Sequence, residues 1–165
     1  MAGVGVNNMK VTKEQVTEHL ARWQGILRLR DWDIDVRIVD QPWRKSGDIK
    51  VDDPNKMAVL MVNETPVCDN LEEIIVHELV HLRLYGLSQM LEDLMAGTFG
   101  KNDDDPRREF AMNQYYTMLE PTVQDLTKGL LALGGQGEAP SWARVRKMVS
   151  AEGTPARPPT PPART

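Results

Sequence analysis

The sequence predicts a small α+β domain in which one helix is followed by a sheet of about three strands and then by further helices. Near the N-terminus, apolar residues recur at helical spacing. Between residues 34 and 51, apolar and polar residues alternate in short runs, as they do in half-buried strands, and residues 57–62 form a continuous apolar run typical of a more buried strand. From Leu71 to Leu133 the helical spacing returns. With 165 residues, of which 41% are hydrophobic, the chain is long enough for one core.

The first half of the domain is expected to hold one helix and the sheet. The helix covers Lys13 to Arg28, because Thr12 and Gln15 have the spacing of a capping box and apolar residues follow at helical intervals. Turn-forming residues then separate three strands, and the last is the most apolar. These strands are expected at residues 34–39, 49–51 and 56–63.

The second half is expected to hold four helical segments. Asp69 or Asn70 can cap the first of them, because short polar side chains accept hydrogen bonds from the free N–H groups of a helix start. Gly86 is expected to end this helix and Pro121 to begin the last one. The four segments are expected at residues 71–85, 88–95, 107–119 and 121–133.

The two ends of the chain are expected to be tails. Residues 1–11 are predicted to be a flexible N-terminus, residues 12–133 the folded domain, and residues 134–165 a Gly- and Pro-rich disordered tail with a short helix at 142–149. A Pro-rich end of this kind could bind a partner protein.

Charge and composition argue against a nucleic-acid-binding, membrane-spanning or secreted protein. From Gly134 onward five basic and two acidic residues give the tail a charge of +3, which leaves −7 for the rest of a chain whose net charge is −4. An acidic domain argues against nucleic-acid binding, which needs clustered Lys and Arg. No apolar run has the length of a membrane span, no secretory signal is visible, and the single Cys68 cannot form an internal disulfide. We therefore expect a cytoplasmic protein.

The segment Val76 to His81 carries the chemistry. His77 and His81 are four residues apart, so on a helix both imidazoles lie on one face, and Glu78 lies one step round. Zinc suits this pattern, since it accepts imidazole nitrogen and, with three protein ligands, leaves a position for water. Zinc lowers the pKa of that water to about 7, and Glu78 could act as the general base. The alternative is a pair of helix histidines without a metal. His19 is expected to be an ordinary helix residue.

The stretch VHELVH, with apolar residues before and between the histidines, resembles the active-site helix of the Glu-liganded zincin metallopeptidases. The resemblance is specific over about ten residues. It implies a minimal zincin-like fold, with the strand Ala58 to Val62 in the place of the edge strand that aligns an extended substrate. The small size is similar to that of compact intracellular or phage-type members, which implies action on one specific protein.

The third metal ligand is open at this point. No His follows His81, so a carboxylate from a later helix must complete the site. We favour Glu109, because it lies early on the next long helix, where the zincins supply their Glu; otherwise Glu109 is an ordinary first-turn acid. Asn113, four residues later, could hold one of the histidines by a hydrogen bond. The other candidates are, in order, Glu92 and Asp93, then Glu120, with the acidic loop Asp103, Asp104 and Asp105 last.

These features predict a zinc-dependent hydrolase that cleaves a peptide bond in a protein or peptide substrate. Three side chains could donate to the oxyanion that forms on the attacked carbonyl, namely Tyr85, Tyr115 and Tyr116. The alternative is a non-catalytic, zinc-stabilised module that binds other proteins. A complete set of two histidines, a base and a carboxylate favours the enzyme, because a purely structural zinc site has no use for Glu78.

Overall fold

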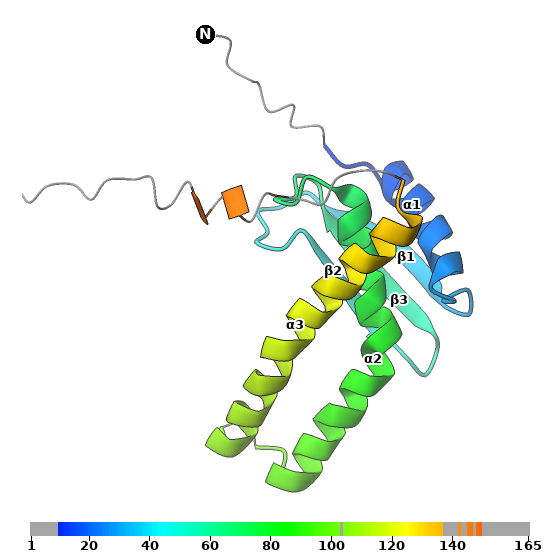
Figure 1. The fold of residues 1–165 in the computed structure, drawn as a ribbon. Coiled ribbons are helices and arrows are strands. Elements are labelled where there is room, and N and C mark those ends of the chain that lie inside the picture. The colour runs from blue at the N-terminus through cyan, green and yellow to red at the C-terminus, as the bar shows by residue number, and fades with distance from the viewer. Residues whose placement is uncertain (1–9, 103, 137–141, 143–144, 147, 150–165) are drawn as a thin grey trace, which may run out of the picture.

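The computed structural model describes residues 10–102, 104–136, 142, 145–146 and 148–149. The predicted α+β class is confirmed: over the described residues the chain forms three helices and a mixed three-stranded sheet (Figure 1). Most of both predicted tails lies outside the described residues. The elements are, in chain order, α1 Lys13–Ile26, β1 Asp33–Val39, β2 Gly47–Asp52, β3 Met57–Asn63, α2 Leu71–Phe99 and α3 Pro106–Gly134.

Helix α1 begins at the predicted capping box. The Thr12 hydroxyl accepts a hydrogen bond from the Gln15 backbone at 3.4 Å, and the Gln15 side chain accepts one from the Thr12 backbone at 3.0 Å. The face formed by Val16, Leu20 and Trp23 is buried. The helix ends two residues earlier than predicted, and Arg28 lies beyond it with a positive φ of 56°.

The sheet has the order β1-β3-β2, in which β3 pairs with β1 in parallel and with β2 antiparallel. The strand Ala58 to Val62 is therefore the centre of the sheet, and its expected place at the edge is wrong. Its apolar run is buried at Leu60 and Val62, which suits a central strand. The antiparallel edge belongs to β2, where charged residues alternate with apolar ones.

Helices α1 and α2 cover one face of this sheet (Figure 1). Helix α1 packs on β1 and on α2, while α2 packs on β2 and β3. The buried core between these layers contains Val36 and Leu60 from the sheet and Ile75 and Leu79 from α2. The first half of α2 is thereby fixed against the sheet.

Helices α2 and α3 form an antiparallel hairpin that extends beyond the sheet (Figure 1). Each has 29 residues, so two helices replace the four predicted segments. Gly86 does not end α2, because a glycine inside a helix lowers the stability of the helix by only about 1 kcal/mol relative to alanine. Pro121 lies inside α3, although proline removes one backbone hydrogen bond. Val123 and Thr127 follow it within the helix and are buried, so packing of this part of α3 maintains the helix across the proline.

Among the described residues, no helix is both long enough and apolar enough to cross a membrane.

Candidate metal centre

The structure brings together two histidines of α2 and one glutamate of α3. Asn70 caps α2, its side chain accepting from the Glu73 backbone at 3.0 Å, and this start fixes where His77 and His81 emerge from the helix. On the facing stretch of α3, Glu120 lies beside both imidazoles. These three residues form the one group of potential metal ligands found in the described part of the chain.

The distances between the nitrogen and oxygen atoms of this group match the spacing of ligands around a tetrahedrally coordinated metal ion. The Nε2 atoms of His77 and His81 are 3.2 Å apart, and the two Glu120 oxygens lie 3.6 Å from His77 Nε2 and 3.4 Å from His81 Nε2. Two ligands bound at about 2.05 Å to a tetrahedral zinc ion are about 3.3 Å apart. The donor set, two imidazoles and a carboxylate, is also one that zinc accepts while keeping an open position. The residues therefore fit a metal ion of this kind.

The third position of the group is held by Glu120, which was the third choice from the sequence, and not by Glu109. Glu109 is exposed in the first turn of α3, whereas Glu120 lies 11 residues further along the same helix. That separation is about 16 Å along the helix axis. The position of Glu109 matches the alternative stated for it, a first-turn acid near a helix start.

The remaining carboxylate candidates lie outside the group. Glu92 accepts hydrogen bonds from Gln89 at 3.2 Å and from the Tyr116 hydroxyl at 3.0 Å. Asp105 caps α3, and its hydrogen bonds with Arg107 lower the pKa of its carboxyl group to about 2. Asp93 and Asp104 are exposed, and Asp103 lies outside the described residues.

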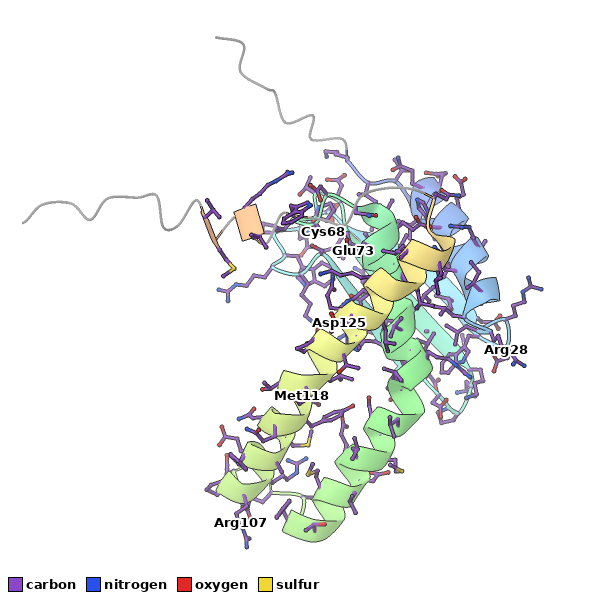
Figure 2. All side chains as sticks on the ribbon, in the orientation of Figure 1. Arg28, Cys68, Glu73, Arg107, Met118 and Asp125 are labelled. Carbon is purple, nitrogen blue, oxygen red and sulfur yellow. The ribbon has the colours of Figure 1, made fainter. Side chains whose placement is uncertain are left out.

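His77 is held from behind by a chain of two hydrogen bonds. Its Nδ1 lies 3.0 Å from Oε1 of Gln124, and Nε2 of Gln124 donates to Glu73 Oε1 at 2.7 Å. Because the carboxylate only accepts, it fixes which end of the Gln124 amide faces His77. The amide oxygen then requires a proton on Nδ1, so Nε2 presents its lone pair to Glu120 and His81. Figure 2 labels Glu73 in the first turns of α2, and Asp125 on the adjacent part of α3.

Gln124 performs the role that had been expected of Asn113, which is exposed. The sequence contained a signal that went unused: Gln124 is four residues after Glu120, and Glu73 is four residues before His77. Each pair therefore shares one face of its helix.

Glu78 lies beside the group, where α2 meets the start of β2. It is 8% exposed, and its burial, together with the negative charge of Asp48, raises the pKa of its carboxyl group to about 8. A Cβ atom placed on Gly47 would lie 2.7 Å from Ile74 Cγ2 and 3.0 Å from Glu78 Oε1. Glycine is therefore required at position 47 for β2 to approach Glu78 this closely.

Burial also lowers the pKa of the second histidine, His81. Desolvation, and then the proximity of His77, lower the pKa of the His81 imidazole. A lowered pKa favours the neutral ring, which is the form that binds metal ions. His19, by contrast, lies on α1 with Nδ1 4.0 Å from Glu72 Oε1, and it is outside the group.

The three tyrosines differ in what their hydroxyl groups contact. Tyr115 donates to Ser88 Oγ at 2.5 Å, and Tyr116 donates to Glu92 Oε1 at 3.0 Å. Tyr85 is half-buried and forms no hydrogen bond through its hydroxyl group with any other described residue.

Comparisons with protein-family models, with curated proteins and with solved structures give no match to this chain.

Proposed function

We propose that this protein is a zinc-dependent peptide hydrolase whose metal ion is held by His77, His81 and Glu120. The observation that supports this most strongly is the convergence of their three side chains at tetrahedral spacing, from two helices, next to the buried Glu78. A site of three protein ligands is the catalytic pattern for zinc, since structural zinc sites are closed by four.

Each residue has a defined task in this proposal. Gln124 and Glu73 hold His77 in the tautomer that presents Nε2 to the ion. A zinc ion held by these residues would supply a water molecule with a pKa near 7 and a Lewis acid for the substrate carbonyl. Glu78 removes a proton from the water as its oxygen adds to the carbonyl carbon, and then gives that proton to the nitrogen as the C–N bond breaks.

No strand among the described residues pairs with the outer edge of β2, and this edge supports an extended peptide as the substrate. The Asn63 backbone N–H donates to the Ser46 carbonyl at 2.9 Å. In this antiparallel pair, Ser46 and every second residue after it along β2 therefore direct their backbone groups towards β3. The backbone groups of Gly47, Ile49 and Val51 then point outward along the edge. A peptide added there as a further strand would begin its pairing at Gly47, beside Glu78.

The metal part of the proposal is tested by zinc analysis of purified full-length protein and variants. We expect about one zinc ion per chain, with binding lost in His77→Ala and in Glu120→Ala. Glu109→Ala is the matched control, because it removes one carboxylate from the same helix outside the group and should retain zinc. Loss of zinc in Glu109→Ala but not in Glu120→Ala would refute the ligand assignment.

The catalytic part is tested with Glu78→Gln, which preserves the shape of the side chain. We expect this variant to bind zinc and to lose cleavage of a peptide library that the native protein cleaves. Equal cleavage by both would refute the role of Glu78. Zinc binding without cleavage by the native protein would favour the non-catalytic interaction module.

A further inference from the structure

Two lysines lie on either side of the point where β2 touches Glu78. A Cβ atom placed on Gly47 would lie 3.0 Å from Glu78 Oε1, so the start of β2 is in contact with the proposed base. Lys45 lies two residues before Gly47, and Lys50 three residues after it. Both ammonium groups contact the carboxylate of Asp48, Lys45 Nζ at 3.2 Å and Lys50 Nζ at 2.6 Å. Two positive charges and one negative charge leave an excess of one positive charge on this strand.

The charges of these lysines reach the proposed catalytic group. Burial and then the charge of Asp48 raise the pKa of the Glu78 carboxyl group. The charges of Lys45 and Lys50 act on the same carboxyl group in the opposite direction. An ammonium group that acts electrostatically on the base is also close enough to act on a charged peptide bound beside it.

The side chain of Lys50 lies on the open face of the sheet. Ile49 and Val51 pack against the core, and successive residues of a strand point to opposite faces. Asp48 and Lys50 therefore point to the face that α1 and α2 do not cover. Residues directly opposite each other on neighbouring strands share a face. In a peptide that pairs with the outer edge of β2, the side chain opposite Lys50 would thus lie beside its ammonium group.

From this placement we propose that the protein selects acidic peptides, with Lys50 and the neighbouring Lys45 binding an Asp or Glu side chain of the substrate strand. This inference rests on the proposed hydrolase function and names the class of its substrate. The acidic residue is three positions from the substrate residue opposite Gly47. A lysine ammonium group has three N–H donors, so Lys50 can donate to the substrate while it still contacts Asp48. A basic side chain at this position would meet the excess positive charge instead.

The test uses zinc-loaded full-length protein and a library peptide that it cleaves, synthesised with Glu, Gln or Lys at each position within four residues of the cleaved bond. At one position we expect kcat/KM to be about threefold to fivefold higher for the Glu peptide than for the Gln peptide, and lowest for the Lys peptide. The difference should lie in KM, because the contact is the same in the bound peptide and in the transition state. It should shrink at 1 M salt, where the Debye length is about 3 Å.

Variants assign the preference to the lysines. Lys50→Gln should lose it, and Lys50→Glu should reverse it, so that the Lys peptide becomes the better substrate. The ratio between two peptides cancels any effect of a variant on Glu78 itself. Lys13→Gln is the matched control and should keep the preference, because Lys13 also pairs with an aspartate, Asp35 at 3.2 Å, but on the opposite edge strand β1. Zinc content and thermal midpoint should stay unchanged in all three variants, since these lysines are exposed.

The outcomes separate the two proposals. If the native protein cleaves peptides without an acidic preference at any position, or if Lys50→Gln retains the preference, the inference is refuted and the hydrolase remains. If Lys50→Gln loses zinc or thermal stability together with activity, the role of Lys50 is structural and the inference is wrong. If zinc-loaded native protein cleaves no peptide of the library, the hydrolase function itself fails, and the inference fails with it.

Discussion

The burial of Glu78 should make the metal-free protein less stable as the pH rises. In the fold the pKa of this carboxyl group is raised from 4.5 to about 8, mainly because the side chain is desolvated. Between these two pH values the unfolded chain has released the proton while the folded chain retains it. The free energy of unfolding therefore falls with pH in this window and is constant, for this group, below 4.5 and above 8. Because the pKa rises from 4.5 to about 8, the free energy of unfolding can fall across this window by an upper bound on the order of 5 kcal/mol.

The variant Glu78→Gln isolates this contribution, because an amide of nearly the same shape does not titrate. Urea denaturation of chelator-treated native protein and variant, from pH 4.5 to 8.5, gives two curves whose difference cancels the other titrating groups. We expect the two proteins to be close in stability at pH 4.5, and the variant to be more stable by several kcal/mol at pH 8. With zinc bound the difference should shrink, since a nearby dication stabilises the carboxylate.

A matched control is Glu109→Gln, which removes an exposed carboxyl group from α3. It should reproduce the pH dependence of the native protein. A difference curve for Glu78→Gln that is flat between pH 4.5 and 8, or that rises in the opposite direction, would show that Glu78 is solvated and would refute the described environment of the base.

Three further substitutions test the packing around the site. Glu72→Ala removes a buried carboxylate that accepts three hydrogen bonds and should cost about 3 kcal/mol in urea denaturation. Gln124→Ala should weaken zinc binding 10- to 100-fold in a competition titration, because His77 loses the partner that fixes its tautomer. Gly47→Ala should cost about 1–3 kcal/mol and lower activity while zinc stays bound, because Cβ overlaps a side chain of α2. Its control, Gly86→Ala, places Cβ in open space and should stabilise by about 0.5–1 kcal/mol.

The strands and α1 could be predicted because their signals are local. The alternation along β1, the apolar run of β3 and the capping box at Thr12 each depend on a few adjacent residues, and the structure has them where expected. The order of the strands could not be predicted in this way. Whether β3 lies at the centre or at the edge depends on where β2 pairs, which is a long-range choice that no short window of sequence contains.

Within the site, the residues of the local motif could likewise be predicted, whereas the residues that contact them from distant parts of the chain could not. His77, Glu78 and His81 are recognisable from six consecutive residues. The sequence around Gly47 indicates only a turn before the second strand, because the contact of Gly47 with Glu78 spans 31 positions of the chain. Gln124 was overlooked, since its role appears only once α3 is placed against α2.

The preference for Glu109 over Glu120 followed from the end expected for the first of these helices at Gly86, which is wrong because α2 continues to Phe99. In an antiparallel hairpin, a residue far from the end of the first helix faces a residue comparably far from the start of the second. His81 lies 18 residues before Phe99, where α2 ends. Glu120 lies 14 residues after Pro106, where α3 begins, and Glu109 only three. A motif helix that ended at Tyr85 would have favoured an early carboxylate, whereas with the continuous 29-residue α2 the carboxylate that lies beside both histidines is near the middle of α3. Because a glycine inside a helix costs little free energy, α2 continues through Gly86, and Glu120 is the carboxylate that lies beside the histidines.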